Sequence, residues 1–485
     1  MALRPRLVAP PPAPSNSWPW HILKHRTLPA STLFTGDRRM EAEGYLSSGF
    51  ALRNLIESRP SGWTSLRTVA HCWQPSRLKG IQVSREFGIP FLAATQAFDV
   101  RPVARKWLSL DRTEDASQRF VAQGTILVTC SGSVGRPTLA CAPLANTLIS
   151  HDLLRVEPRS ARDWGWIYAY LHAPQTRAMS NSVQYGHIIK HLETAHLDAL
   201  PLPILPDEVA AYFNMEVAKI LQLRNDGHRL LLEAEARFSE ALGIPNTPDW
   251  GENGFSVRAA DALYAKRRRF DATFHNPGVS ALRTHLQKHG RGFEEIGSAG
   301  YDLWLPGRFR RIPAEDGVLL VDSGDLTEIN PNITRRIADI DFGDPYQGRI
   351  RAGWILMARS GQTYGVIGSA VLAGRDLEDK VVTDDVIRLR PRADALIRPG
   401  YLVIALSHPI LGRPLVKSLA YGSSIPHIEV SDLSSLNVVR LALEEEEVIA
   451  ELAEASAESR ASADLLEQAI TSKAEEILDA FIGGT

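Results

Sequence analysis

The sequence contains little cysteine and no long apolar run. Its 485 residues include only three cysteines, Cys72, Cys130 and Cys141, and no two of them form a CxxC pair. This argues against a disulfide framework and against a zinc knuckle. The longest apolar runs, such as "YLVIAL", have the length of a strand, and the Pro-rich start lacks the apolar core of a signal peptide. We therefore expect a cytoplasmic protein that does not enter a membrane.

The net charge of −2 hides a strong segregation of charge along the chain. Residues 441–485 contain 12 acidic residues and two basic ones, which leaves 52 basic and 44 acidic residues, or +8, on residues 1–440. A basic surface is what a polyanion binder needs, although an excess of this size is also compatible with an ordinary solvated surface. The acidic final segment would be repelled by nucleic acid.

Internal repetition is the strongest signal in the sequence. The stretch "GTILVTCSGSVGR" (124–136) returns as "GWILMARSGQTYG" (353–365), in which one extra residue separates the Ser-Gly from the later Gly. Three further segments match in the same order: "RRMEAEGYLSSGFALRNLIESRP" with "RRFDATFHNPGVSALRTHLQKHG", "ISHDLLRVEP" with "VTDDVIRLRP", and "YGHIIKHLETAHLDAL" with "YGSSIPHIEVSDLSSL". The chain therefore contains two similar domains, with insertions in loops.

Each repeat leads into a long amphipathic helix. The first is predicted from Asp207 to Leu242, with Asp207 as N-cap and an apolar stripe through Phe213, Val217 and Ile220, weakened at Gly227. The second is predicted from about Leu441 to Phe481, with a stripe at Val448, Leu452, Ala455, Ser459, Ser462, Leu466, Ile470, Ile477 and Phe481. Helices with a single stripe need a partner, and each is the obvious partner of the other.

The predicted fold is α+β, with two similar mixed α/β domains joined by two long helices packed as an antiparallel coiled coil. We expect a Pro-rich, disordered N-terminus at 1–30, a first domain at 31–205 and a central helix at 206–243. A second domain follows at 244–440, and an acidic helix at 441–485 completes the chain.

Several motifs also have ordinary structural explanations. A strand followed by Ser-Gly is usually a hairpin turn, and "SGSVG" lacks the Gly-Lys-Ser/Thr of a phosphate-binding loop. The histidines of "HIIKHLETAH" could bind a metal, but the second copy keeps only His427, so we expect no metal site. The basic run "AKRRRF" (265–270) is a solvated turn or a phosphate contact. No "PPY" loop of an amino-methyltransferase and no nuclease-type cluster occurs, so we expect no catalysis by this chain alone.

With these motifs in the order repeat, helix, repeat, helix, the chain resembles the specificity subunit of Type I restriction-modification enzymes from about Arg38 to Phe481. The resemblance implies two target recognition domains, each reading one half of a split double-stranded DNA sequence, and helices that set the spacing. It also implies two modification subunits as partners, and possibly restriction subunits. S-adenosylmethionine, Mg and ATP would belong to those partners, with no cofactor in this chain. Two alternatives remain, a specificity-like DNA-binding adaptor of another phage-defence assembly and a stand-alone DNA-modifying enzyme.

Direct reading of bases needs hydrogen-bonding side chains on loops. The candidate residues differ between the two copies, whereas the strands that carry them do not. They are Ser131, Ser133 and Arg136 in the first Ser-Gly loop, Ser360, Gln362 and Tyr364 in the second, Tyr185, His187 and Lys190 in the first Tyr-Gly segment, and Tyr421, Ser423 and Ser424 in the second.

Overall fold

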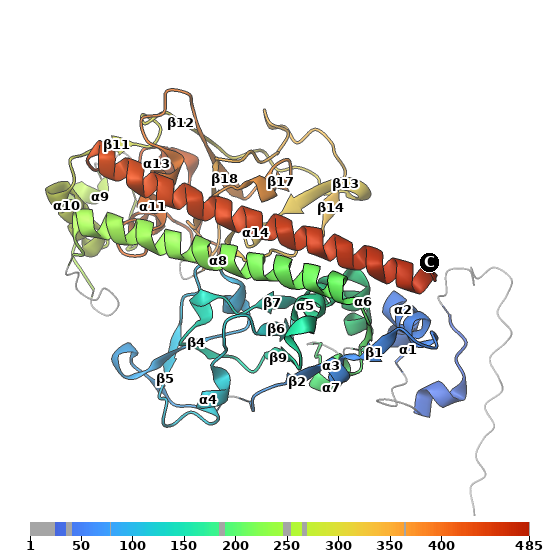
Figure 1. Ribbon diagram of the computed structural model, residues 1–485. Helices are drawn as coiled ribbons and strands as arrows, with labels where there is room; N and C mark the ends of the chain where they lie inside the picture. Colours follow the sequence, from blue (N-terminus) through green and yellow to red (C-terminus); the bar gives the residue numbers. More distant parts are fainter. Residues whose placement is uncertain are drawn as a thin grey trace, which may run out of the picture.

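Two mixed domains lie on either side of a pair of long helices (Figure 1). The structure is a computed structural model that describes residues 25–34, 41–77, 79–183, 190–245, 254–263, 269–362 and 365–484. The predicted α+β class and its arrangement are confirmed. Within the described residues, no helix combines the length and the apolar character needed to cross a membrane.

The long helices are α8 (Asp207–Leu242) and α14 (Leu443–Gly483), and they pack antiparallel along their length (Figure 1). The end of α8 lies in one apolar core with the start of α14, and the start of α8 shares a second core with the end of α14. Near the middle, the Ser456 hydroxyl donates to the carbonyl of Gly227 (2.6 Å). A Cβ at Gly227 would lie 3.2 Å from the Ser456 carbonyl oxygen, so this glycine permits the close approach of the helices.

The predicted apolar stripe of α8 is confirmed, because Phe213, Val217, Ile220, Leu231, Ala234, Phe238 and Leu242 are buried. The stripe predicted for α14 is confirmed at Ile470, and Leu452, Leu466, Ile477 and Phe481 are half-buried against the two cores, but the prediction was wrong at Val448 and Ala455, which are exposed. Val448 is 38% exposed, whereas the buried face carries Ile449, Ala450, Ala453, Ser456, Ala457, Ala461, Ala463, Ile470, Ala474 and Leu478. Five of the buried residues between 450 and 463 are alanines, and small side chains with little hydrophobic weight allow α8 and the domain helices to approach α14 closely.

The first domain is built on an antiparallel sheet of order β2-β9-β6-β7. A second sheet of order β3-β5-β4-β8 pairs β4 with β8 in parallel, and β1 pairs with β10 where the chain enters and leaves the domain. The strands are β1 (Trp63–Ser65), β2 (Ala70–Trp73), β3 (Gln82–Val83), β4 (Ile89–Leu92), β5 (Lys106–Leu108), β6 (Ile126–Thr129), β7 (Pro137–Leu139), β8 (Leu148–Ile149), β9 (Leu153–Pro158) and β10 (Pro201–Pro203).

The second domain repeats this topology, except that its second sheet has three strands among the described residues and no counterpart of β3. Its main sheet has the order β12-β18-β15-β16, β13 pairs in parallel with β17 and antiparallel with β14, and β11 pairs with β19. The strands are β11 (Gly292–Glu295), β12 (Tyr301–Trp304), β13 (Pro313–Val321), β14 (Arg336–Ile337), β15 (Ile355–Ala358), β16 (Ala370–Leu372), β17 (Val381–Val382), β18 (Val386–Pro391) and β19 (Asn437–Arg440).

Short helices join the sheets to the long helix pair. A buried helix in each domain, α5 (Trp164–His172) or α11 (Pro399–Ser407), packs against both α8 and α14. The remaining helices are α1 (Ala42–Leu46), α2 (Ser48–Glu57), α3 (Leu66–Val69), α4 (Ala116–Arg119), α6 (Pro174–Val183), α7 (Thr194–Asp198), α9 (Ala259–Leu263), α10 (Pro277–His289), α12 (Arg413–Ser418) and α13 (Val430–Ser434).

Candidate nucleic-acid interface

An arginine buried in the same place holds the main turn of each domain. Arg155 donates to the carbonyls of Ser150, Leu153 and Ile149, and it is 0% exposed. Arg388 donates to the carbonyls at the three equivalent positions, in Thr383, Val386 and Val382. Burial lowers the pKa of each guanidinium to about 10, so both remain charged at neutral pH. Each therefore fixes the turn that precedes β9 or β18 through hydrogen bonds to backbone carbonyls.

Each turn supports the adjacent Ser-Gly loop through the same backbone bonds. In the first domain, Cys130 N–H donates to the Asp152 carbonyl (3.0 Å), and its own carbonyl accepts from Leu192 N–H (2.9 Å). In the second, Arg359 N–H donates to the Asp385 carbonyl (3.1 Å), and its carbonyl accepts from Ile428 (3.1 Å). Backbone bridges join Ser131 to His191 and Ser360 to His427. The two segments that the sequence singled out therefore lie side by side in each domain.

In the first domain, the structure places Ser131 and Ser133 at the tip of the loop but not Arg136. Ser133 is exposed and Ser131 is half-buried, next to Gly132, whose φ of +71° suits a glycine. Arg136 is only 8% exposed, and its guanidinium donates to Glu328 (2.6 Å) and to the Asn330 carbonyl (2.6 Å) of the second domain. The expectation that Arg136 is a loop-tip residue was wrong, because its partners lie about 190 residues away in sequence.

The second Ser-Gly loop is longer than the sequence alignment suggested. Gly135 and Gly368 occupy the same place, since each has φ near +70° and donates to the last residue of the preceding strand, Thr129 or Ala358. Five residues separate Thr129 from Gly135, whereas nine separate Ala358 from Gly368. The difference is therefore four residues rather than one. Gln362 is exposed on this loop and its amide donates to the Ser424 carbonyl (3.0 Å), while Tyr364 lies outside the described residues.

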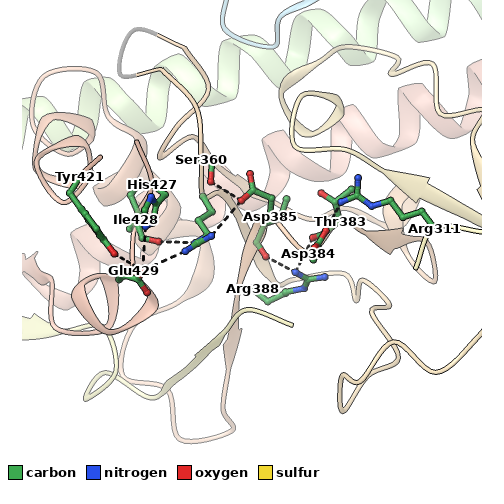
Figure 2. A network of polar contacts seen from close by, with 12 residues as sticks. Arg311, Ser360, Thr383, Asp384, Asp385, Arg388, Tyr421, His427, Ile428 and Glu429 are labelled. Atoms are coloured by element: carbon green, nitrogen blue, oxygen red, sulfur yellow. Dashed lines mark hydrogen bonds and ion pairs between the residues drawn. The ribbon is translucent and has the colours of Figure 1, made fainter. Parts of the chain in front are cut away.

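A polar network holds the second loop against the Tyr-Gly segment (Figure 2). The Ser360 hydroxyl donates to Asp385 (2.7 Å), and the Tyr421 hydroxyl donates to Glu429 (2.7 Å) while its ring packs on His427. Arg359 joins both parts, since it lies 3.8 Å from Asp385 and 3.4 Å from Glu429. The hydroxyls of Ser360 and Tyr421 are therefore committed within the domain, and both residues position the loops.

Ser423 and Ser424 are exposed beyond this network, next to Ile425, which is 68% exposed. In the first domain, the ammonium of Lys190 forms an ion pair with Glu43 of α1 (3.1 Å). Tyr185 and His187 lie outside the described residues. Among the candidates that the structure describes, Ser133, Gln362, Ser423 and Ser424 are thus the ones with exposed side chains.

Sequence analysis missed the residues that support the loops, namely Arg359, Asp385 and Glu429. It also misjudged Arg269 of the basic run, which is neither solvated nor free for phosphate. Arg269 is buried, bonds both oxygens of Asp271 (2.7 and 2.8 Å), and donates to the carbonyls of Leu419 and Ala420 just before Tyr421. Its preservation between the copies, where Arg39 takes the same place in the aligned segments, was the available signal.

The two domains also contact each other directly. The N–H of Val100 donates to the Thr327 carbonyl (2.8 Å), and the N–H of Ile329 donates to the Phe98 carbonyl (2.6 Å). Arg136 stacks over Phe98 at 4.1 Å and reaches Glu328 across this bridge. Burial and the nearby Glu328 raise the pKa of Asp99 to about 7. The interface therefore contains a carboxyl that is partly protonated at neutral pH.

A buried ion pair links the long helices next to α5. Arg224 of α8 donates to Glu467 of α14 (2.7 Å), which also accepts from the Tyr168 hydroxyl. Burial opposes both charges, yet the mutual attraction of the pair outweighs it, so the pKa of Arg224 lies above its ordinary value and that of Glu467 below it. Burial raises the pKa of nearby Asp464 to about 7. Within the described residues, no three His, Cys, Asp or Glu side chains are grouped to hold a metal ion.

A scan of protein-family models gives no match, and no curated protein matches the chain. Among solved structures, the chain is similar to the S subunit of a Type I restriction-modification system from M. genitalium, with 13% identity, 88% of this chain and 96% of that chain covered, and a TM-score of 0.31.

It is also similar to the HsdS subunit from Thermoanaerobacter tengcongensis, with 14% identity, 87% and 97% coverage and a TM-score of 0.26. A shorter likeness, over 36% of this chain and 28% of the other, is to the type IIG restriction endonuclease BpuSI, at 13% identity and a TM-score of 0.26.

Proposed function

We propose that this chain is the DNA sequence-recognition subunit of a Type I restriction-modification complex and that each domain reads one half of a bipartite target. One observation carries the proposal. The same scaffold is built twice, down to the three carbonyls bonded by Arg155 and Arg388, while the loops that it supports differ in length and in side chains. A backbone scaffold shared by both domains, with loops that differ in their polar side chains, suits two domains that recognise two different DNA sequences.

The proposed contacts are the candidate residues other than Arg136, which the domain interface occupies. Ser133 would contact bases of the first half-site. Gln362, Ser423 and Ser424 would contact bases of the second, because the side chains of all four residues are exposed. Ser131, Ser360 and Tyr421 would act mainly by fixing the loop backbone. Tyr185, His187, Lys190 and Tyr364 stay in the proposal as predicted from the sequence.

The chain would carry out no chemistry itself. Modification subunits would dock on the helix pair and supply the methyl transfer, with restriction subunits added where cleavage occurs. The start of α14 offers an acidic docking surface formed by Glu444, Glu447 and Glu451, which are exposed. Glu446 does not belong to it, because its carboxylate bonds Arg440 at 2.8 Å through both oxygens and is buried. Charge reversal of Glu444 and Glu447 should therefore weaken assembly with a modification subunit.

Methylation-sensitive genome sequencing with and without the gene tests the proposal. Loss of one bipartite methylated motif on deletion would support it. Replacing Ser133 by alanine should change only one half of the motif, and replacing Gln362 and Ser423 only the other. A change in both halves from either variant would contradict the division of labour. A specificity-like adaptor would bind the bipartite sequence without methylation, and a stand-alone enzyme would bind S-adenosylmethionine as the purified chain.

The helix pair is proposed to act as the ruler between half-sites. The 36 residues of α8 give a length of about 54 Å at 1.5 Å per residue. Adding seven residues to both helices at matched depth should separate the domains by about 10 Å, or about three base pairs. A longer spacer with unchanged half-sites would support the ruler, whereas activity retained at the original spacing would contradict it.

A further inference from the structure

A cavity of about 490 Å³ lies where the first domain, the second domain and α14 meet. Arg177 of α6 lines it from the first domain, and Arg336 of β14 and Lys380 line it from the second. Figure 1 shows α6 and β14 near the C-terminal half of α14, the part of the helix that supplies Gln468 and Thr471 to the cavity wall. The cavity is therefore a shared feature of the two domains rather than a pocket within one of them.

Arg177 is an unusual lining residue, because its guanidinium makes no hydrogen bond or ion pair with any residue that the structure describes, and its Nε is buried. Burial, together with the neighbouring charge of Arg136, lowers its pKa to about 10, which leaves it charged at neutral pH. Arg136 also has a buried Nε without a partner among the described residues. Arg177 as a whole is half-buried, but a buried N–H group without a hydrogen-bond partner costs stability.

The second domain provides an internal control for this position. Arg413 is the counterpart of Arg177, 236 residues later, just as Tyr421 is the counterpart of Tyr185. The guanidinium of Arg413 donates to the Ser369 hydroxyl (2.8 Å) and to the Gly365 carbonyl (3.0 Å). In the first domain, the residue in the place of Ser369 is Arg136, and no carbonyl of the shorter loop accepts from the Arg177 guanidinium within the described residues. The guanidinium at this position is thus hydrogen-bonded in the second domain, whereas in the first domain it has no partner among the described residues.

The acidic residues of the cavity do not cancel this charge. Glu467 is paired with Arg224 at 2.7 Å, and Asp464 lies 3.5 Å from the same guanidinium. Burial raises the pKa of Asp464 to about 7, which reduces its negative charge at neutral pH. Among the described residues, neither Arg177 nor Arg336 forms an ion pair with a carboxylate.

We propose that this interdomain cavity binds a phosphate group, with the guanidinium of Arg177 as its main ligand and Arg336 as a further donor. Arginine presents several N–H donors to phosphate oxygens at once, and a dianion would supply the counter-charge that the first domain lacks. The phosphate belongs either to a DNA backbone or to a free phosphate compound. The first source rests on the function proposed above, and the second does not.

The test uses the full chain with Arg177→Met, Arg177→Lys and the control Arg112→Met, which removes an exposed cation from the same domain away from the cavity. Thermal unfolding is followed in pyrophosphate and in chloride at equal ionic strength, and duplex DNA binding is followed against salt. Pyrophosphate should stabilise the wild-type chain and the Arg112→Met control, and Arg177→Met should weaken its binding at least tenfold, with partial recovery in Arg177→Lys. Without phosphate, Arg177→Met should fold at least as stably as the wild type, because it removes a half-buried cation whose buried Nε has no hydrogen-bond partner among the described residues.

The two sources give different results. If the phosphate comes from DNA, Arg177→Met should also lower DNA affinity for all sequences and reduce the slope of log K against log salt by about 0.9. If a free phosphate compound is the ligand, only the pyrophosphate effect should be lost and DNA binding should be unchanged. Equal pyrophosphate and DNA binding by Arg177→Met and Arg112→Met would overturn the site. Failure of the wild-type chain to recognise a DNA sequence would refute the proposed function but not the pyrophosphate result.

Discussion

Removing one partner of the buried pair between Arg224 and Glu467 should loosen the helix pair. The carboxylate of Glu467 is 1% exposed, accepts from Arg224 at 2.7 Å and also accepts from Tyr168. Glu467→Gln keeps the shape of the side chain but removes the nearest negative charge from Arg224, which keeps its bond to the Tyr168 hydroxyl (3.3 Å) and the more distant carboxylate of Asp464, at 3.5 Å. Breaking a buried ion pair in this way costs about 3 to 5 kcal/mol. We expect a loss of stability in that range at pH 7.

Hydrogen exchange of the amides in the middle of α8 and α14 measures this loss directly, because it reports the free energy of local opening in a chain that has two domains. The double variant Arg224→Met, Glu467→Leu removes both charges and should be more stable than either single variant, since no charge stays buried alone. Glu444→Gln at the exposed start of the same helix serves as the control and should change stability by no more than about 0.5 kcal/mol.

The effect should depend on pH with a definite sign. The pKa of Glu467 is lower in the folded protein than its ordinary value, because the attraction of Arg224 outweighs burial. Its contribution to stability is therefore present above the unfolded pKa of about 4.3 and is lost as the pH falls through the folded pKa. Equal stability of Glu467→Gln and wild type at pH 7, or a double variant less stable than both single variants, would refute this account.

Three further predictions concern charge. Binding of the chain to duplex DNA should be weak and should fall steeply with salt, because residues 1–440 carry a net charge of only +8 and phosphate contacts dominate such affinity. A gel-shift series with the same affinity at low and high salt would contradict this prediction. Asp99→Asn should stabilise the domain contact at pH 8 but have little effect near pH 4. The reason is that the pKa of Asp99 is raised to about 7, so the charged carboxylate costs stability increasingly as the pH rises from its unfolded pKa to 7. Equal shifts of the melting temperature at both pH values would count against this prediction. Burial lowers the pKa of His408 to about 4, so the neutral ring should contribute stability above pH 6.5 that is lost as the pH falls from 6.5 to 4. In thermal melts, the melting temperature of His408→Gln should therefore fall less between pH 6.5 and pH 4 than that of the wild type.

The sequence predicted the frame of the fold better than its contacts. The stripe of α8 was found because Phe213, Val217 and Ile220 are large apolar residues at helical spacing. The stripe of α14 was misplaced in part because alanines and Ser456 form much of its buried face, and small residues give little hydrophobic signal. The buried face of a helix can be predicted from sequence where large apolar side chains form it, but not where small side chains do.

The candidate loops were found because a Ser-Gly turn was repeated in the same order in both halves. Arg136 was misassigned because loop-tip and interface arginines look alike in sequence, and its partner Glu328 lies in the other domain. The four extra residues of the second loop also escaped the alignment, since only the backbone bonds of Gly135 and Gly368 show which positions correspond. Contacts between distant segments depend on how the domains meet, and no local pattern encodes that.

The buried arginines have a consequence for how such a chain can change by recombination. In the part of the chain that the structure describes, Arg155 and Arg388 donate hydrogen bonds only to carbonyls of their own domain, so a domain exchanged as a whole would arrive with its loop anchor intact. The contact of Arg136 with Glu328 joins residues from both halves, so it would be lost unless the incoming half supplied a matching carboxylate. In chimeric chains, each half should therefore fold readily, but the contact between the two domains should be lost.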